Sequence, residues 1–328
     1  VSTGVPSRQR ANAGLDQNPV TSSIIFREGA PSRDPQVLII ARRLGAGVRS
    51  GSTQPGGFSR GMASRLAMVD GRTVFAKAIP IRDRFAHRYR IEGDTATQLP
   101  AEIPAPAVRF MLEIDGWRVL VFDDVTGRHP RFDQPTELAA VLAVVEDMAR
   151  MLTPNPLPDV PTLADDLGSD LSGWRKLAGG ELAGNLDEWS ARNVDRLAVL
   201  ESGWERATVG QTLLHTDLRA DNMLVRPDGT VMIVDWSWPS VGAAWVDLVF
   251  LATAFALHGV DPEPILGSHA LTRGVDPDAI SALVCALAGY WIRESRRPGG
   301  SQSVALRRHR AESGRATVAW LQRRVGWK

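Results

Sequence analysis

The sequence predicts an α+β protein with two lobes around a cleft. Three Asp-Gly pairs, each between runs of β-forming residues, predict hairpins, and two of these hairpins lie within the first 125 or so residues. Apolar residues at three- and four-residue steps predict helices through most of the remainder. The chain of 328 residues also exceeds the roughly 250–300 residues that one hydrophobic core usually supports. Strands followed by helices are typical of a β-rich N-terminal lobe and a mainly helical C-terminal lobe.

Composition divides the chain into three regions. Residues 1–35 are rich in Ser, Pro, Gly, Asn and Arg without a sustained period, so we expect a loosely ordered N-terminus. Residues 36–124 should form the N-terminal lobe, and residues 125–328 the C-terminal lobe.

Two hairpins are expected in the N-terminal lobe and a shorter one in the C-terminal lobe. Aspartate and glycine tolerate the positive φ angles that tight hairpin turns require. The predicted strand pairs are residues 64–69 with 72–79 across Asp70-Gly71, residues 108–114 with 117–122 across Asp115-Gly116, and residues 223–226 with 231–234 across Pro227-Asp228-Gly229.

Two amphipathic helices are expected in the C-terminal lobe, and residues 88–98 are expected to be helical in the N-terminal lobe. The first of the two begins near Pro135, because proline is accepted in a first helical turn. The apolar positions are Leu138, Val141, Leu142, Val145, Met148 and Leu152 in the first helix, and Ile280, Leu283, Val284, Leu287, Tyr290 and Trp291 in the second.

The composition excludes several classes of protein. The longest apolar stretch, residues 248–257, is far shorter than the roughly 20 residues that cross a bilayer, and the polar start of the chain lacks the apolar core of a signal peptide. We therefore expect a cytoplasmic protein without a membrane partner. The single cysteine, Cys285, lies among apolar residues, which favours helix packing over a reactive thiol.

The C-terminal segment is strongly basic. Residues 293–328 contain ten Lys and Arg against two Glu, a balance that can indicate nucleic-acid binding. However, Val304, Leu306, Val318, Trp320 and Leu321 interleave with the arginines. This pattern favours helices with one apolar side and a solvated basic face, so we expect no nucleic-acid partner.

Acidic and amide side chains gather around the third predicted hairpin. The segment His215-Thr216-Asp217-Leu218-Arg219-Ala220-Asp221-Asn222 leads into it, and Asp235 follows it. Taken singly, each acid is explained as a turn-forming residue. Together they match the kinase catalytic-loop spacing His-x-Asp-Leu-x-x-x-Asn, with an Asp at the end of the next hairpin. Because Mg²⁺ prefers oxygen ligands, Asn222 and Asp235 are candidate magnesium ligands, and Asp217 remains as a candidate base.

Lys77 is the candidate phosphate ligand of the N-terminal lobe. By strand alternation it shares a face with the apolar Phe75 and Ile79, so its ammonium needs an anion, and Glu92 in the following helical stretch is the expected partner. The glycine-rich residues 56–61 precede this hairpin, where backbone N–H groups could cover phosphates. Glycine clusters also occur as plain loops, and a strand lysine usually points to solvent.

These motifs together resemble the aminoglycoside phosphotransferase family, which has a protein-kinase-like fold. The resemblance runs in order from about Gly51 to the C-terminus. It rests on Gly57 to Gly61, Phe75-Ala76-Lys77, Glu92, Val121-Phe122-Asp123-Asp124, the segment from His215 to Asn222, Ile233-Val234-Asp235-Trp236 and Asp247-Leu248.

The resemblance implies a role for each matching residue. Asp217 would accept the proton of the substrate hydroxyl, and Arg219 would neutralise the transferring phosphoryl group. Asn222 and Asp235 would bind Mg²⁺, and His215 and Asp247 would brace the loop. In the N-terminal lobe Gly57, Ser59 and Gly61 would cover the nucleotide phosphates. Lys77, held by Glu92, would bind these phosphates. The hinge of Phe122, Asp123 and Asp124 would bind the base of the nucleotide.

The implied activity is a magnesium-dependent transfer of the γ-phosphate of ATP or GTP to a hydroxyl of a small molecule. The acceptor would be an antibiotic, such as an aminoglycoside or a nucleoside, in resistance or self-protection, and the enzyme a monomer or homodimer. A housekeeping kinase for an amino alcohol or sugar is the alternative. A nucleotide-binding module without catalysis and an arginine-tail nucleic-acid binder are weaker alternatives.

The residues beside both central aspartates depart from the related patterns. Thr216 replaces the glycine that is usual in the family's His-Gly-Asp, and a β-branched residue restricts the backbone there. Trp236 follows Asp235 in place of Phe-Gly, so a protein kinase with a phosphorylated activation loop is not expected.

Two features suggest a substrate surface. The tryptophans near Asp235, namely Trp236, Trp238 and Trp245, are expected mainly in the core, with stacking on a sugar or heteroaromatic ring as the alternative. A cationic substrate could meet the acids between residues 163 and 204, which are Asp165, Asp166, Asp170, Asp187, Glu188 and Asp195.

Overall fold

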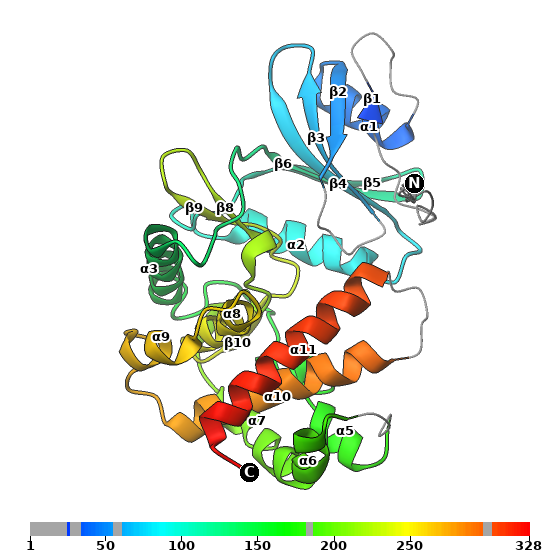
Figure 1. Ribbon diagram of the computed structural model, residues 1–328. Coiled ribbons are helices and arrows are strands. Elements are labelled where there is room, and N and C mark those ends of the chain that lie inside the picture. The colour runs from blue at the N-terminus through cyan, green and yellow to red at the C-terminus, as the bar shows by residue number, and fades with distance from the viewer. Residues whose placement is uncertain (1–24, 27–33, 55–60, 182–185, 298–303) are drawn as a thin grey trace, which may run out of the picture.

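A β-rich lobe and a helical lobe make up the computed structural model, which describes residues 25–26, 34–54, 61–181, 186–297 and 304–328 (Figure 1). The predicted α+β, two-lobed fold is confirmed. The expected boundaries at residues 35 and 124 fall at the start of helix α1 (Pro35–Leu44) and just after strand β6 (Trp117–Asp123). Most of residues 1–33, where we expect loose order, lie outside the described residues.

The N-terminal lobe is an antiparallel sheet with a helix on each face. Its strand order is β1-β2-β3-β4-β6-β5. Alternate residues of β4 point to opposite faces, so Val74 and Ala76 pack with α1, whereas Lys77 faces α2. Helix α2 lies between the sheet and the helical lobe (Figure 1). The elements are β1 (Ile25–Phe26), β2 (Val48–Thr53), β3 (Met62–Met68), β4 (Thr73–Pro80), α2 (Ala86–Gln98) and β5 (Val108–Ile114), with α1 and β6 as given above.

Both hairpins predicted for this lobe are present. Strand β3 pairs with β4, and β5 with β6. At the second turn Asp115 and Gly116 have φ angles of 49° and 78°, as the Asp-Gly pattern predicts. Val69, expected as a strand residue, instead lies in the first turn and is 67% exposed.

The C-terminal lobe is mainly helical and contains two short strand pairs. The predicted third hairpin is β8 with β9, whereas the pairing of β7 with β10 was not predicted. The helices are α3 (Pro135–Met151), α4 (Leu163–Leu167), α5 (Gly173–Ala178), α6 (Glu188–Glu201), α7 (Trp204–Ala207), α8 (Val246–Leu257), α9 (Pro262–Ser268), α10 (Pro277–Arg296) and α11 (Val304–Val325). The strands are β7 (Thr212–Leu214), β8 (Met223–Val225), β9 (Val231–Ile233) and β10 (Ser240–Gly242), with a 3₁₀ turn at Ala220–Asn222.

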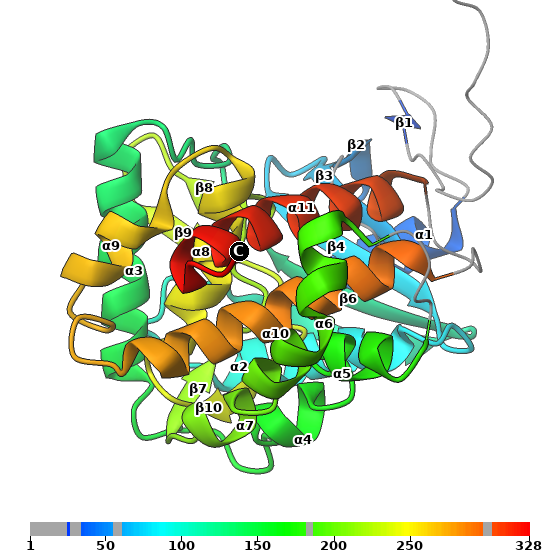
Figure 2. The same ribbon diagram turned by 60° about the horizontal axis from the view of Figure 1, so that its bottom comes forward.

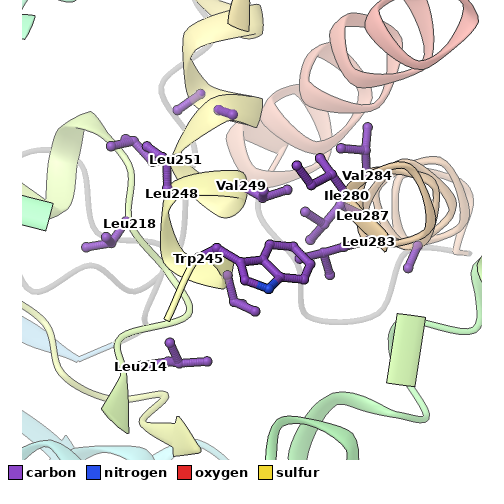
Figure 3. Close-up of a cluster of buried hydrophobic side chains, with 14 of the residues drawn as sticks. Leu214, Leu218, Trp245, Leu248, Val249, Leu251, Ile280, Leu283, Val284 and Leu287 are labelled. Atoms are coloured by element: carbon purple, nitrogen blue, oxygen red, sulfur yellow. The ribbon is translucent and has the colours of Figure 1, made fainter. Parts of the chain in front are cut away.

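The core of this lobe lies where α8 meets α10. Figure 3 shows Trp245 and Val249 beside Ile280, Leu283 and other apolar residues of α10. Leu218, directly after Asp217, is 2% exposed and belongs to the same core. The segment that carries the candidate base is therefore anchored by hydrophobic burial as well as by polar contacts.

The tryptophans serve mainly as core residues, as expected. Those that are buried are Trp174, Trp189, Trp204, Trp236, Trp245 and Trp320. Cys285 is also buried, and its thiol donates to the Leu197 carbonyl, which agrees with a packing role. Within the described residues no helix is both long and apolar enough to span a bilayer.

Helix α11 packs along α10 and reaches α8 (Figures 1 and 2). The stripe predicted from Val318, Trp320 and Leu321 is buried. The expectation that the arginines form a solvated face is only partly correct. Arg310 lies 3.3 Å from the buried Glu294, and Arg324 lies 2.7 Å from Glu263. These arginines join α11 to carboxylates of α9 and α10.

Replacement of Trp320 tests whether α11 is structural. The ring is fully buried and its Nε1 donates to Glu263 Oε1 at 2.6 Å, so Trp320→Ala should lower the free energy of unfolding by about 3–5 kcal/mol. Val304→Ala is the control on the same helix, because Val304 is 74% exposed. Urea unfolding of both variants measures the difference, and equal midpoints would show that α11 is dispensable for stability.

Candidate active site

The candidate catalytic loop connects β7 to the 3₁₀ turn and is held by buried hydrogen bonds. Asp247, in the first turn of α8, accepts the backbone N–H groups of His215 at 2.8 Å and Thr216 at 2.9 Å. The Asp217 N–H donates to His215 Nδ1, so Nε2 carries the ring proton and donates to the Val234 carbonyl at 3.0 Å. The imidazole is thus a neutral brace between the loop and the end of β9.

Thr216 adopts a conformation that explains the glycine of the related motif. Its φ is 58°, in the left-handed region that β-branched residues avoid. Two hydrogen bonds hold it there, because its N–H binds Asp247 and its hydroxyl donates to the Trp238 carbonyl at 2.5 Å. The loop therefore keeps its shape despite the substitution.

Asp217 lies at the centre of a charged cluster. Asn222 Nδ2 donates to its carbonyl at 2.8 Å and to its Oδ2 at 3.0 Å. Burial, together with the charges of Asp235 and Asp221, raises the pKa of Asp217 to about 6, although Arg219 and Asn222 oppose the rise. A third of the side chain, 31%, remains exposed, so its carboxylate can be reached from solvent.

Arg219 lies beside both neighbouring acids. Its Nη2 is 2.8 Å from Asp221 Oδ2, and its Nε is 3.8 Å from Asp217 Oδ1. A guanidinium at this place lies next to the group that would bind the substrate hydroxyl. Its action on the transferring phosphoryl group stays a prediction.

Lys77 joins the two lobes. Its Nζ is 2.7 Å from Glu92 Oε1 and 2.9 Å from Oε2 in α2, and 3.2 Å from Asp235 Oδ1 in the C-terminal lobe. Burial opposes the ammonium charge, but Asp235 and Glu92 raise the pKa of Lys77. Burial and the charge of Asp235 raise the pKa of Glu92 to about 7, although Lys77 opposes the rise. The contact between Lys77 and Glu92 that the sequence predicts is present.

Asn222 and Asp235 offer oxygen ligands at one place. The Val234 N–H donates to the Asn222 carbonyl at 3.0 Å, which holds Asn222 beside the residue preceding Asp235. Burial alone would raise the pKa of Asp235, but Lys77, Ser237 and His215 lower it, so the group is a carboxylate at neutral pH. Because Asn222 Nδ2 is bound to Asp217, its side-chain oxygen is left for a cation. An amide and a carboxylate fit Mg²⁺, which takes its other ligands from phosphates and water.

The proposed nucleotide-covering residues are only partly described. Gly57 and Ser59 lie outside the described residues. Gly61 is buried, and a Cβ there would lie 2.3 Å from Tyr89 Oη and 2.6 Å from the Ala78 carbonyl. This glycine is therefore required where β3 passes α2, and its contact with phosphate stays a prediction.

The predicted hinge uses its side chains for structure. Asp124 Oδ1 accepts from Arg65 Nε at 2.6 Å, and Asp123 pairs with Arg109. The Asp123 N–H donates to the Ala107 carbonyl at 2.9 Å, so it is not available to a base. Phe122 pairs with Phe75 across β4 and β6. Any contact with adenine or guanine must come from the remaining backbone groups of this segment.

At least three of the six acids expected to meet a cationic substrate have partners within the protein. Asp165 accepts from the Thr162 hydroxyl at the start of α4, and Asp187 accepts from the Ser190 N–H at the start of α6. Asp166 accepts from Arg88 at 3.2 Å. Short spacing of Thr or Asp before a helix indicates capping, so two of these roles could have been predicted.

Arg88 is a residue that the sequence prediction missed. Its guanidinium carbon lies 3.4 Å from the ring centroid of Trp238, three residues after Asp235. The only signal in the sequence is that Arg88 precedes Glu92 by four residues, which places both side chains on one face of the predicted helix.

The sequence model of the phosphotransferase enzyme family matches residues 60–281 of the chain. No curated protein matches its sequence.

Several solved structures share the fold. A thermostable mutant of aminoglycoside phosphotransferase APH(4)-Ia is 15% identical, covers 89% of this chain and 100% of its own, and has a TM-score of 0.60. Another structure of that enzyme, with a TM-score of 0.61, is a ternary complex with AMP-PNP and hygromycin B. Choline kinase LicA from Streptococcus pneumoniae is 13% identical, with a TM-score of 0.59 and coverage of 87% and 98%. An aminoglycoside phosphotransferase from Alicyclobacillus acidocaldarius is 13% identical, with a TM-score of 0.54 and coverage of 97% of both chains.

Removal of the Lys77 ammonium tests its place in the site. Lys77→Ala should lower turnover at limiting nucleotide by about 10²–10³-fold, because a group aimed at phosphate charge is lost. Glu92 can then take up a proton, because burial and Asp235 raise its pKa and Lys77 no longer opposes the rise, so the fold should survive. Lys176→Ala, on the distant helix α5, is the control. Steady-state kinetics and thermal unfolding measure both effects, and wild-type turnover in Lys77→Ala would refute the assignment.

Proposed function

The chain belongs to the phosphotransferase enzyme family, and on that premise we propose that it transfers the γ-phosphate of ATP or GTP to a hydroxyl group of a small molecule. The observation that carries the proposal is the convergence of Lys77, Asp217 and Asp235. The lysine of one lobe binds the candidate metal acid of the other, and the candidate base lies within the same charged cluster.

The proposed mechanism assigns one task to each side chain. Asp217 accepts the proton of the acceptor hydroxyl. At the same time the hydroxyl oxygen forms a bond to the γ-phosphorus, and the bond from that phosphorus to the nucleoside diphosphate breaks. Asn222 Nδ2 orients the Asp217 carboxylate through the hydrogen bond to Oδ2. Lys77 holds nucleotide phosphates, and Arg219 offsets negative charge on the phosphoryl group. When bound by Asn222 and Asp235, Mg²⁺ would supply charge neutralisation between the phosphates.

We propose an antibiotic as the acceptor, in resistance or self-protection. Support comes from the structural neighbour that binds hygromycin B together with a nucleotide analogue. The choline kinase neighbour supports the alternative of an amino-alcohol or sugar acceptor. Because the reaction consumes ATP or GTP, we expect the enzyme to act in the cytoplasm. We expect it to be a monomer or homodimer.

A panel of acceptors tests the reaction and its substrate class. We expect one compound among aminoglycosides, nucleoside antibiotics, peptide antibiotics, amino alcohols and sugars to gain the mass of one phosphate, with ATP or GTP and Mg²⁺ present. The gain should disappear in Asp217→Asn. Product masses measured for the whole panel identify the acceptor, and nucleotide binding without transfer to any of them would favour a module without catalysis.

Two aspartate variants should fail in different ways. Asp217→Asn keeps size and hydrogen bonding but cannot accept a proton, so Mg-nucleotide binding should persist while turnover drops by roughly 10²–10⁴-fold. Asp235→Asn removes a charge facing the metal and should weaken Mg-dependent nucleotide binding itself. Calorimetric titrations with and without Mg²⁺ separate the two cases.

The matched control for this pair is Asp228→Asn, in the exposed turn of the same hairpin. It should change neither binding nor turnover. Equal loss of Mg-dependent binding in Asp217→Asn and Asp235→Asn would show that Asp217 is a metal ligand, and unchanged turnover in Asp217→Asn would exclude the mechanism.

A further inference from the structure

We propose that Arg88 is a positioning residue that keeps Glu92 on Lys77 by fixing helix α2 to the C-terminal lobe. The proposal rests on the proposed phosphotransfer for its effect on turnover, but the contacts themselves are independent of it. Arg88 contacts Trp238, Asp166 and the Ser237 carbonyl, and these three contacts together form the Arg88 interlobe contact.

The contact connects α2 to two parts of the other lobe. The guanidinium lies 3.4 Å from the centroid of the Trp238 ring, its Nη2 is 3.2 Å from Asp166 Oδ1, and its Nη1 donates to the Ser237 carbonyl at 3.4 Å. Ser237 and Trp238 follow Asp235, whereas Asp166 belongs to α4. The Arg88 and Asp166 side chains are each only 15% exposed. Such burial distinguishes this contact from an ion pair on the surface, which contributes little.

Arg88 acts on the same side of α2 as Glu92. The two residues are four positions apart, so they lie on one helix face about one turn apart. If the start of α2 is fixed against the C-terminal lobe, the Glu92 carboxylate is fixed in front of Lys77. The distance from Lys77 Nζ to Glu92 Oε1 is 2.7 Å in this arrangement.

The Lys77–Glu92 pair alone does not secure this position. The ammonium also has Asp235 Oδ1 at 3.2 Å, so it keeps a carboxylate partner if α2 moves away. A second tether between α2 and the C-terminal lobe would therefore keep Glu92 next to the ammonium. Arg88 supplies it from the turn preceding Glu92.

The C-terminal-lobe residues that Arg88 contacts are in turn bonded to the candidate catalytic loop and to β10. The Trp238 carbonyl accepts the Thr216 hydroxyl, next to Asp217, at 2.5 Å. Asp166 Oδ2 is 3.4 Å from the Ser240 hydroxyl in β10, the strand that pairs with β7 just before the loop. One guanidinium therefore sets α2 against the segments that position both candidate acids.

The chemistry of the contact requires arginine. A planar guanidinium can stack on an indole ring while its edge donates to a carboxylate and a carbonyl, whereas a lysine ammonium is a single point charge. The buried Arg88 Nε has no hydrogen-bond partner among the described residues. The side chain is thus placed for stacking and for its two terminal nitrogens rather than for the greatest number of hydrogen bonds.

A double-mutant cycle between Arg88→Ala and Glu92→Gln tests the proposal. Each single variant should weaken Mg-ATP binding and lower turnover, with a loss in turnover of up to roughly 10²-fold for Arg88→Ala, as expected when a reacting geometry is displaced. If Arg88 acts through Glu92, the double variant should be little worse than the worse single variant. Losses that multiply in the double variant would overturn the proposal, as would wild-type Mg-ATP affinity in Arg88→Ala.

Matched variants separate positioning from general stability. Arg90→Ala, an exposed arginine of the same helix, should leave Mg-ATP affinity within twofold of wild type. Compared with Arg88→Ala, Arg88→Lys should restore more of the thermal stability than of the Mg-ATP affinity, because lysine keeps the charge but cannot stack on Trp238 as a guanidinium does. If Arg88→Lys restores affinity fully, the guanidinium geometry has no positioning role. Trp238→Leu provides a second route to the same test if Arg88→Ala does not fold.

Calorimetry with Mg-ATP keeps this test distinct from that of the proposed function. Phosphotransfer to no acceptor would refute the proposed function but leave the binding cycle interpretable. Hydrogen exchange adds a readout without nucleotide. Amides of residues 86–98 should exchange faster in Arg88→Ala than in Arg90→Ala, and equal exchange would show that Arg88 does not fix α2.

Discussion

The two lobes depend on one ammonium group that serves carboxylates from both of them. Lys77 lies on a strand of the sheet, Glu92 on the helix beneath it, and Asp235 at the end of a hairpin in the other lobe. Without this cation the buried Glu92 carboxylate and the partly exposed Asp235 carboxylate would repel each other. Glu92 would also lack an interaction that offsets its lost solvation, which is unfavourable in a low-dielectric interior. The contact between the lobes and the charge state of the site therefore depend on the same ammonium group.

Hydrogen bonds within the protein, rather than an ion pair between the lobes, fix the candidate catalytic loop. Asp247 binds two successive backbone N–H groups, and the His215 ring binds one group on each nitrogen. Leu218 is inserted into the helical core at the same time. In the proposed mechanism, preorganisation of this kind would leave Asp217, Arg219 and the side-chain oxygen of Asn222 to contact ligands without rearrangement of the loop.

Local patterns in the sequence were sufficient for the hairpins and for the spacing of the acids, since turn chemistry and strand alternation act over a few residues. They also predicted the partner of Lys77, because an ammonium among apolar neighbours requires an anion. Contacts between distant segments were not predictable in this way. The three-residue pairing of β7 with β10, the stacking of Arg88 on Trp238 and the use of Asp124 by Arg65 depend on tertiary placement. The ion pairs of the basic C-terminal segment were not predictable for the same reason, because Arg324 lies far from Glu263 in the sequence and Arg310 lies on a different helix from Glu294.

The neutral His215 has a further consequence for behaviour in acid. Burial lowers its pKa, although Asp247 and the Val234 carbonyl oppose the shift, so the folded state takes up this proton less readily than the unfolded chain. The stability that the neutral ring contributes is therefore present above the unfolded pKa of about 6.5 and declines as the pH falls below it. A proton on Nδ1 would also remove the acceptor for the Asp217 N–H. Protonation of this one ring would therefore loosen the backbone of the loop around Asp217.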